Sequence, residues 1–262
     1  MAGMVDDERP VLVTGGTGTL GRALVHTLLD AGRAVRVLSR RERSPAAPAE
    51  ADWVVGNLLT GAGLAEAVTG VSAVVHCASD PRRPDDDLDA AVQLLLAARA
   101  AAAPHLVNVS IVGVDRVPYP YFKAKHRVEE IVEDGGVPWT ILRATHFHDW
   151  VATMLDKLSR GPVAVAPAGM SAQPVDVREV ASRLVQLVVE GPSGRVDDLG
   201  GPQVLTTTEL MRTYLAATGR RRPVWAVPVP GPLSGFRHGN HLTPEHATGR
   251  LTFAEWVQSR SR

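Results

Sequence analysis

Short apolar runs rich in valine alternate with longer stretches of helical periodicity through the first half of this chain. The runs are Val11 to Thr14, Ala34 to Leu38, Trp53 to Val55, Ala73 to His76, Leu106 to Val109 and Thr140 to Leu142. Between them, apolar residues recur every three or four positions, as at Leu20, Leu24 and Leu28. The alternation predicts an α/β fold in which a doubly wound parallel sheet carries helices on both faces.

The pattern loosens after about residue 145, where proline and glycine cluster at 161–169, 191–194, 200–202 and 228–235. Helical periodicity returns at 177–190, 207–218 and 252–259. We therefore expect residues 1–145 to form the core of the sheet and residues 146–262 to form a smaller C-terminal lobe. This lobe would complete the same domain and bind a substrate.

An acidic run, Asp85 to Asp87, stands just before the apolar periodicity that begins at Leu88. Negative charge is favourable at a helix N-terminus, because the helix dipole is positive there. A solvated loop is an equally good interpretation of the same run.

Composition narrows the classes of function. The chain has 28 basic and 28 acidic residues. Nucleic acids and anionic membranes are bound by clustered Lys and Arg, so this balance argues against both as the principal partner. The single cysteine, Cys77, cannot form an internal disulfide, which favours a reducing compartment. The segment from Met1 to Pro10 lacks the apolar core of a signal peptide, and no apolar run is long enough to span a membrane. We expect a cytoplasmic protein with a small-molecule substrate and neither a nucleic-acid nor a membrane partner.

A glycine-rich loop joins the first predicted strand to a predicted helix that starts at Arg22. Gly15, Gly18 and Gly21 would allow a tight turn, close approach of a pyrophosphate, and packing of the helix against the sheet. The N–H groups at the start of the helix would face the phosphates. With a strand before it and a helix after it, the loop predicts a dinucleotide site formed by Gly15, Thr17, Gly18, Thr19, Leu20 and Gly21.

The second predicted strand ends in Arg40 and Arg41, where an NAD-selective site has an acidic residue. Arginine can instead pair with a 2′-phosphate through two parallel hydrogen bonds, so this strand end favours NADP. A solvated strand end in an arginine-rich chain is the alternative interpretation. Asn57 follows the third strand, where it could hydrogen-bond an adenine edge, and Leu58 and Ala78 complete the predicted cofactor-binding residues.

Two tyrosine–lysine pairs stand close together in a chain that has only three lysines. Tyr121 and Lys125 are four residues apart within a helical pattern, so both would lie on one helix face. The lysine ammonium stabilises a phenolate, lowers the phenol pKa from about 10, and favours the tyrosine as a general acid. Tyr119 and Lys123 share the spacing, but the prolines on either side of Tyr119 indicate that it precedes the helix. We therefore favour the later pair.

These residues resemble a known family. The loop from Thr14 to Gly21, the pair Tyr121 and Lys125, and the segment from Thr140 to Arg143 are similar to those of the short-chain dehydrogenase/reductases, and more narrowly to their atypical, NmrA-like branch. The resemblance covers nearly the whole chain. It implies a Rossmann fold in which Tyr121 donates or removes a proton, Lys125 orients the nicotinamide ribose of the cofactor, and a hydride passes to or from carbon 4 of the nicotinamide.

One position departs from the family pattern. Family enzymes usually place a catalytic Ser or Thr at the end of the fifth strand, often in a doubled serine, to hold the substrate carbonyl. Here Ser110 is followed by Ile111. Ser110 is a candidate catalytic residue, but its side chain could equally point into the strand packing. The NmrA-like branch also includes proteins that bind the dinucleotide without turning it over.

His146, Phe147, His148 and Trp150 follow the sixth predicted strand. Chain that leaves the carboxyl edge of a parallel sheet lines a ligand crevice, so these four residues are candidates for substrate binding. Their rings suit an aromatic or polycyclic substrate, although packing within the lobe explains them equally well. We predict no metal site, because no third ligand stands at a recognisable spacing from the two histidines.

The sequence thus predicts an NADPH-dependent oxidoreductase that reduces a carbonyl or quinone-like group of a small molecule by hydride transfer. Tyr121 would supply the proton, and Lys125 and Ser110 would complete the catalytic residues. Two alternatives stay open: a non-catalytic NADP-binding sensor, favoured by Ile111, and a sugar-nucleotide epimerase or dehydratase, disfavoured by Arg40. A homodimer is compatible with the sequence.

Overall fold

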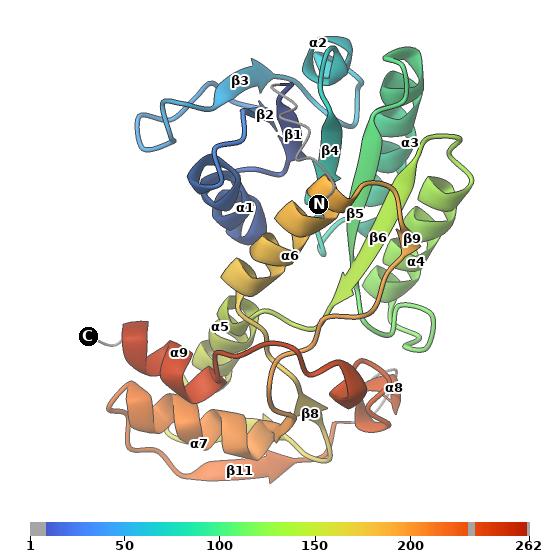
Figure 1. Cartoon of the computed structure of the whole chain (residues 1–262). Helices are drawn as coiled ribbons and strands as arrows, with labels where there is room; N and C mark the ends of the chain where they lie inside the picture. Colours follow the sequence, from blue (N-terminus) through green and yellow to red (C-terminus); the bar gives the residue numbers. More distant parts are fainter. Residues whose placement is uncertain (1–8, 230–233, 261–262) are drawn as a thin grey trace, which may run out of the picture. The chain divides into compact units, whose positions relative to one another are not determined.

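The chain divides into two compact units in the computed structural model, which describes residues 9–229 and 234–260 (Figure 1). The first unit comprises Met1–Val109, Arg127–Ile141 and Ala181–Val196. The second unit comprises Ser110–His126, Leu142–Val180 and Asp197–Arg262. The domain boundary expected after residue 145 stays a prediction.

A seven-stranded sheet has the strand order β3-β2-β1-β4-β5-β6-β9. Its strands are β1 (Val11–Thr14), β2 (Val35–Ser39), β3 (Asp52–Val55), β4 (Ala73–His76), β5 (His105–Ile111), β6 (Trp139–Ala144) and β9 (Gly194–Arg195). The pairs run parallel, with Val13 of β1 between Val37 of β2 and Val75 of β4. The direction of the strand order reverses between β1 and β4. This is the doubly wound Rossmann arrangement, which confirms the predicted fold class.

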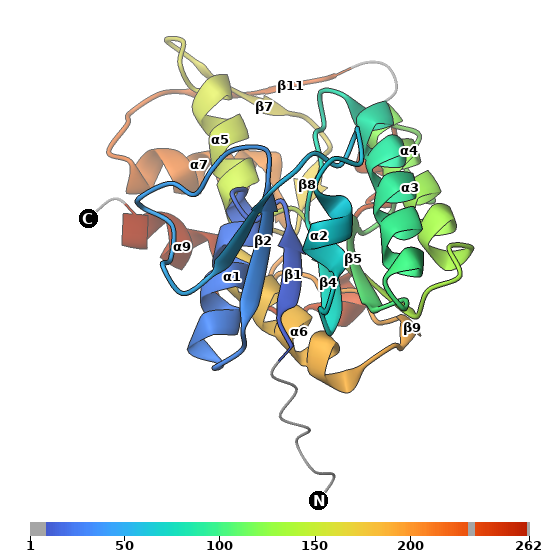
Figure 2. The same ribbon diagram turned by 90° about the horizontal axis from the view of Figure 1, so that it is seen from above.

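Helices cover both faces of the sheet within the first unit (Figures 1 and 2). They are α1 (Thr19–Asp30), α2 (Leu64–Val68) and α3 (Pro84–Ala100), together with the parts of α4 (Pro120–Glu133) and α6 (Val177–Glu190) that begin at Arg127 and Ala181. Leu38 and other strand residues pack with α2, α3 and the second half of α4 in one apolar core. Val37 alternates with Leu38 and faces the opposite side, where a Cβ on Gly16 would contact both Val37 and Val25 of α1.

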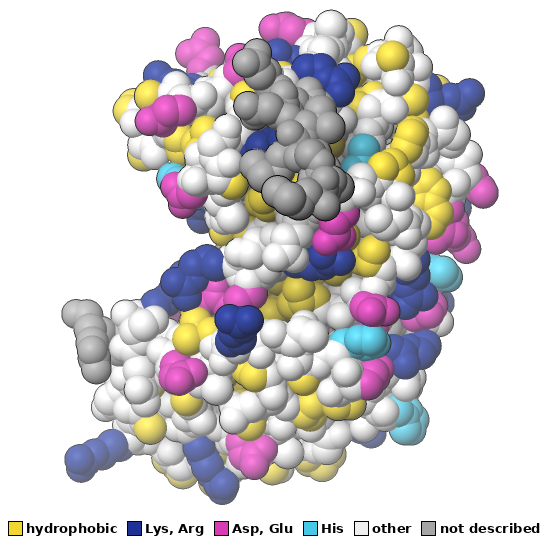
Figure 3. Space-filling model, viewed as in Figure 1, with side chains coloured by type: hydrophobic (Ala, Val, Ile, Leu, Met, Phe, Trp, Pro, Cys, Tyr) yellow, Lys and Arg dark blue, Asp and Glu magenta, His cyan; other side chains and the backbone are white. Residues whose placement is uncertain are grey.

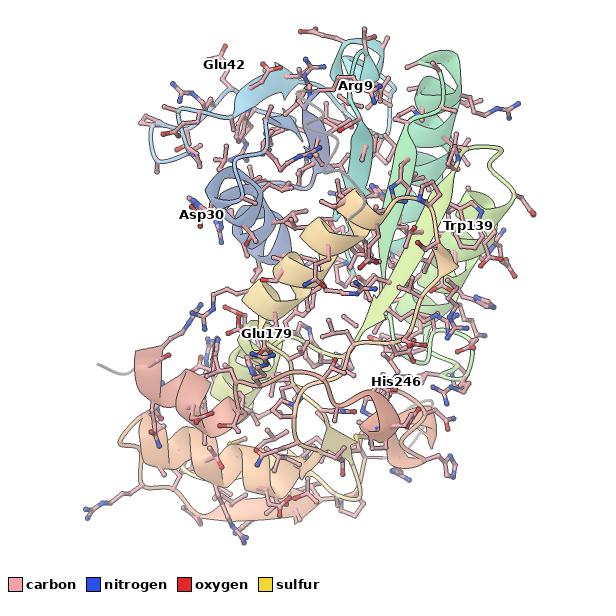
Figure 4. All side chains as sticks on the ribbon, viewed as in Figure 1. Arg9, Asp30, Glu42, Trp139, Glu179 and His246 are labelled. Carbon is pink, nitrogen blue, oxygen red and sulfur yellow. The ribbon has the colours of Figure 1, made fainter. Side chains whose placement is uncertain are left out.

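The predicted strands agree with β1 to β6 to within a few residues, because most of these short apolar runs are buried in the sheet; β3, at the sheet edge, is only partly buried. The seventh strand, β9, has only two residues and was not predicted, since two residues carry no periodicity. Trp139, labelled in Figure 4, lies beside this strand: a Cβ on Gly194 would make an ordinary van der Waals contact with its ring at 3.7 Å. The acidic run lies in the first turn of α3, which confirms a helix start there in place of a solvated loop.

The second unit has its own apolar core, built from α5, α7, α9 and short strands. Its elements are α5 (His148–Leu158), β7 (Ala164–Pro167), β8 (Ser171–Ala172), β10 (Leu205–Thr206), α7 (Thr207–Ala217), β11 (Val224–Val227), α8 (Ser234–Arg237), a 3₁₀ helix (Pro244–His246) and α9 (Phe253–Arg260). Strands β7 and β11 pair in parallel, and β8 and β10 pair antiparallel. Glu179, labelled in Figure 4, accepts hydrogen bonds from the N–H groups of Arg250 (2.7 Å) and Leu251 (3.2 Å). Its carboxylate therefore holds the turn that leads into α9.

Acidic and basic side chains are interspersed over the face seen in Figure 3, in keeping with the formal net charge of +0. Within residues 9–229 and 234–260, no helix combines the length and the apolar character that crossing a bilayer requires.

Candidate functional site

The loop between β1 and α1 is so tightly built that two of its glycines cannot gain a side chain without backbone movement. Gly15 has φ of +68°, and a Cβ there would stand 2.7 Å from the backbone nitrogen of Ala78. A Cβ on Gly21 would overlap the Gly15 carbonyl oxygen, which accepts a 2.8 Å hydrogen bond from the Gly18 N–H. The loop therefore lies directly against the chain that follows β4, where the strand order reverses.

The start of α1 is suited to an anion. Gly18 precedes the helix in an extended conformation and has no side chain that could cap it. Thr17, Gly18 and Thr19 are exposed, whereas Leu20 and Gly21 are buried against the fold. A helix N-terminus of this kind behind a glycine loop attracts the negative charge of phosphate groups. These residues fit the pyrophosphate of a dinucleotide.

Arg40 and Arg41 directly follow β2, and both are exposed. The backbone of this turn is fixed, because the Trp53 indole N–H donates a 2.8 Å hydrogen bond to the Arg41 carbonyl oxygen. The Arg41 N–H also donates to the Ser39 hydroxyl oxygen at 3.2 Å. Among the residues that the structure describes, neither guanidinium has an acidic partner. Guanidinium groups without an acidic partner are suited to pairing with a phosphate group.

Asn57 forms a turn after β3. Its side-chain oxygen accepts a 3.0 Å hydrogen bond from the Leu59 N–H, which fixes the amide and leaves its NH₂ group as a donor. Leu58 packs against the apolar core of the first unit.

Asp87 was not anticipated as a site residue. It is 5% exposed in the first turn of α3, and its carboxylate accepts hydrogen bonds from the Ser79 hydroxyl and, at 3.0 Å, from the Asp80 N–H. It therefore fixes the loop after β4, next to the Ala78 backbone against which Gly15 packs. The acidic run in the sequence includes this residue, but nothing in the sequence distinguishes it from the two aspartates before it.

The second unit contains the predicted catalytic pair. Helix α4 begins at Pro120, so Tyr119 precedes it, as its flanking prolines indicate. Tyr121 is half-buried and Lys125 is 4% exposed, whereas Lys123 is exposed. Tyr121 and Lys125 are one helical turn apart and therefore share a face of α4. Of the two lysines, the buried Lys125 is the one whose surroundings suit a specific role.

Ser110 lies in β5 and is 3% exposed. Its hydroxyl oxygen is inaccessible to solvent and has no hydrogen-bond partner within the described part of the chain. The next residue, Ile111, packs with Val114, Val117 and Phe122. The catalytic role of Ser110 stays a prediction.

The turn between β5 and α4 is anchored to β6. The buried guanidinium of Arg143 pairs with the Asp115 carboxylate at 3.1 Å, and the Val112 N–H donates a 3.1 Å hydrogen bond to the Ala144 carbonyl oxygen. Although burial raises the pKa of Asp115, the hydrogen bond and the charge of Arg143 outweigh it and lower that pKa below its usual value. These contacts hold the segment that leads into Tyr121.

Five rings form an aromatic cluster in the second unit: Phe122, His146, Trp150, Phe236 and His241. Tyr119 contacts two of them edge to face, Phe122 at 6.4 Å and Phe236 at 6.1 Å. His146 stacks on Trp150 with ring centroids 4.6 Å apart, and Phe236 meets His241 at 4.9 Å. Tyr121 contacts the Phe122 ring edge to face at 6.5 Å. Because Trp150 is 49% exposed, the cluster reaches the surface of the unit. The arrangement can stack against a flat aromatic ring.

Phe236 and His241 were not predicted as site residues, because they lie about ninety residues after His146 and contact it only through the fold. Several hydrogen bonds hold their segment. The His241 Nε2 donates to the Ser171 carbonyl oxygen at 2.9 Å, and the buried Gln173 side-chain amide bonds to both the N–H and the carbonyl of Thr243. No local sequence pattern predicts these contacts.

The four predicted substrate residues do not all lie together. His146 and Trp150 belong to the aromatic cluster, whereas His148 packs on Phe253 and Trp256 and donates from Nε2 to the Leu251 carbonyl oxygen at 3.1 Å. Phe147 precedes α5 and pairs with Val175. Substrate contacts by Phe147 and His148 stay predictions. Within the described residues, no group of three or more His, Cys, Asp or Glu side chains is arranged to hold a metal ion.

Known proteins share this sequence and fold. The chain is 34% identical over 215 residues to a (4-alkanoyl-5-oxo-2,5-dihydrofuran-3-yl)methyl phosphate reductase of Streptomyces griseus, a match that covers 80% of this chain and 74% of the relative. It is 27% identical over 235 residues to a photosystem II assembly factor of Cyanophora paradoxa, covering 84% and 72%. The fold matches an Escherichia coli NADPH-dependent quinone oxidoreductase complexed with NADPH, with a TM-score of 0.80, 18% identity and coverage of 95% and 99%.

Residues 15–189, which include the glycine loop, α4 and the segment after β6, match the NAD(P)H-binding family. This match and the strand order agree with the resemblance that the motifs suggested. The chain therefore belongs to the NAD(P)H-binding family.

Proposed function

We propose that this protein is an NADPH-dependent reductase of a small molecule that carries a conjugated carbonyl or a quinone-like group. The observation that carries the proposal is the position of Tyr121 in the second unit. It is half-buried, shares a helix face with the enclosed Lys125, and contacts the aromatic cluster through Phe122. A proton donor beside a surface for aromatic stacking suits a planar carbonyl substrate.

The chemistry divides between the cofactor and the chain. NADPH, when bound, supplies a hydride from carbon 4 of its nicotinamide and leaves as NADP⁺. The substrate carbonyl carbon gains the hydride and the Tyr121 hydroxyl gives its proton to the carbonyl oxygen. A simple carbonyl thereby becomes an alcohol, and a quinone becomes a hydroquinone once the proton on the reduced carbon has moved to the second oxygen. The phenolate left on Tyr121 then takes a proton from solvent. The Lys125 ammonium stabilises that phenolate, which favours proton donation near neutral pH.

The residues of the first unit supply cofactor binding. The glycine loop and the start of α1 bind the pyrophosphate, Arg40 and Arg41 bind the 2′-phosphate, and the Asn57 NH₂ group meets the adenine. The named activity of the Streptomyces griseus relative supports a reductase, and the substrate in that name contains a carbonyl conjugated to a ring double bond.

A direct assay tests the proposal: NADPH oxidation by the purified protein with a panel of naphthoquinones, benzoquinones and α,β-unsaturated lactones. We expect turnover of at least one member, with a Lys125→Met variant that still binds NADPH losing about 10²- to 10⁴-fold in kcat. A protein that binds NADPH tightly and reduces no member of the panel would contradict the proposal.

A second candidate function is a non-catalytic NADP-binding sensor. The observation in its favour is Ser110, whose hydroxyl is inaccessible and whose neighbour Ile111 replaces the second serine of the family pattern. The relative named as a photosystem II assembly factor supports a role other than reduction for some relatives. A cytoplasmic location and a homodimer stay predictions of the sequence.

A further inference from the structure

A reductase of this family needs a hydrogen-bond donor for the carbonyl oxygen besides the tyrosine. A donor is required because negative charge develops on that oxygen as hydride arrives at carbon. Ser110 is poorly placed for the role, since its hydroxyl is buried away from solvent in β5. The inference that follows rests on the proposed function and asks which side chain supplies this donor.

The histidines near the aromatic cluster differ in what their ring nitrogens do. His241 and His148 each bond from Nε2 to a backbone carbonyl, and the Nδ1 atom of each is buried. His146 is half-buried, and among the described residues its ring makes aromatic contacts but no hydrogen bond. Its nitrogens are therefore not committed to the fold.

The imidazole plane of His146 is fixed by its neighbours. Trp150 stacks on it at 4.6 Å with an interplanar angle of 28°, and the rings of His241 and Phe122 lie 5.6 and 6.2 Å away. Phe122 also contacts Tyr121, so one ring adjoins both the proton donor and His146. A fixed donor loses little entropy when it binds a ligand.

The ring is also neutral at physiological pH. Burial and the neighbouring His241 lower the pKa of His146 to about 3, and burial lowers the pKa of His241 as well. A neutral imidazole keeps one N–H donor and can polarise a carbonyl without carrying a charge into an apolar surface.

We propose that His146 donates a hydrogen bond from its ring N–H to the substrate carbonyl oxygen, in the role that the doubled serine has in related enzymes. Trp150 acts through it, as a positioning residue that holds the imidazole plane. Tyr121 remains the proton donor, so the carbonyl oxygen has one donor from α4 and one from the segment after β6.

Two substitutions of His146 separate hydrogen bonding from packing. His146→Phe keeps an aromatic ring on Trp150 but removes the N–H donor, and His146→Asn keeps an N–H donor but removes the ring. If His146 holds the carbonyl, kcat falls about 10²- to 10³-fold in His146→Phe and much less in His146→Asn. A packing role predicts the reverse order, which would overturn the proposal. His238→Leu, at an exposed histidine of the same unit, controls for loss of an imidazole.

A second readout needs no turnover. The carbonyl stretching frequency of bound ¹³C-labelled 1,4-naphthoquinone, measured by infrared difference spectroscopy on the NADP⁺-loaded protein, should be lower than in water-free solvent. It should return towards the free value in His146→Phe but not in His146→Asn. An unchanged frequency in His146→Phe, or no binding of the quinone, counts against the proposal.

These results distinguish the two proposals. If the wild type shifts the carbonyl stretch through His146 but never oxidises NADPH, the donor role stands and the reductase function fails. If the wild type turns over and both His146 variants equal it, the reductase function stands and the donor role fails.

Discussion

At the scale of single residues, the contrast between two lysines carries most of the functional argument. Lys125 is enclosed and Lys123 is exposed, although the two have the same spacing from a tyrosine. Burying an ammonium group costs free energy unless other groups compensate its charge. Burial therefore distinguishes the two tyrosine–lysine pairs, which have the same spacing. Arginine is common elsewhere in the chain, which makes lysine at this position more informative.

A positive charge at position 125 should not by itself be sufficient for activity. In Lys125→Arg the larger, planar guanidinium cannot occupy the space of a compact ammonium, so kcat/KM with NADPH should fall by about 10-fold or more. Lys123→Arg, at the exposed position, should retain wild-type kinetics. Steady-state assays of both variants check this, and equal activity in the two would remove the distinction.

The two arginines after β2 predict cofactor preference. Replacing Arg40 and Arg41 with Asp removes the charge-assisted hydrogen bonds to a 2′-phosphate, each worth about 1.5–3 kcal/mol, or roughly 10- to 150-fold in affinity. The Kd for NADPH should rise and the Kd for NADH should change little. Arg43→Asp, in the same exposed loop, controls for the general loss of positive charge. Wild-type protein that binds both cofactors equally would refute the specificity argument.

At the scale of elements, two segments of the second unit can pack closely only because a glycine lies between them. Gly113, in the turn after β5, has φ of +84°, and a Cβ there would overlap the carbonyl oxygen of Asn240. The Asn240 side-chain amide donates a 3.2 Å hydrogen bond to the Arg116 carbonyl oxygen, which joins the same segments. The turn that leads into α4 is thereby fastened to the segment that carries His241.

Gly113→Ala should therefore lower both stability and activity. Gly32 offers a matched comparison, because its φ is +71° and a Cβ there would contact nothing within 4 Å. Gly32→Ala should show only backbone strain, about 1–2 kcal/mol, and normal kinetics. Gly113→Ala should show a larger fall in Tm and a raised KM for substrate. Equal effects of the two substitutions on Tm and KM would contradict the packing argument.

A buried histidine that joins β5 to the start of β6 should make the folded protein less stable in acid. The His105 ring bonds through Nε2 to the Thr140 hydroxyl at 2.9 Å, and burial lowers the pKa of His105 to about 4. Between about pH 6.5 and pH 4 the unfolded chain binds a proton that the folded chain does not. Stability is therefore greatest above pH 6.5 and falls as the pH is lowered through this window, by up to about 1.4 kcal/mol per pH unit for one such group.

Urea unfolding between about pH 4 and 7 measures this slope. His105→Gln keeps a hydrogen-bonding side chain without a titrating ring, so its slope should be shallower than that of the wild type. If the slope were the same in His105→Gln as in the wild type, the acid sensitivity would belong to other groups. His146 is the first candidate, because its pKa is also lowered.

At the scale of the whole molecule, the sequence predicted what local patterns encode. The short apolar runs predicted β1 to β6, and the prolines around Tyr119 predicted where α4 begins, whereas α1 begins at Thr19, three residues before the expected start at Arg22. The strand β9 and the contact of Phe236 and His241 with His146 were not predicted, because they depend on residues far apart in the chain. The burial of Lys125 and of the Ser110 hydroxyl is likewise a property of packing, which spacing does not reveal.

The role of Tyr121 as the proton donor of an NADPH-dependent reductase can be tested by comparing three proteins. NADPH oxidation is measured with the best substrate of the quinone and carbonyl panel for the wild type, Tyr121→Phe and Tyr119→Phe. The account predicts that Tyr121→Phe loses about 10²- to 10⁴-fold in kcat while its Kd for NADPH is unchanged, and that Tyr119→Phe retains activity. Full turnover by Tyr121→Phe would contradict the account.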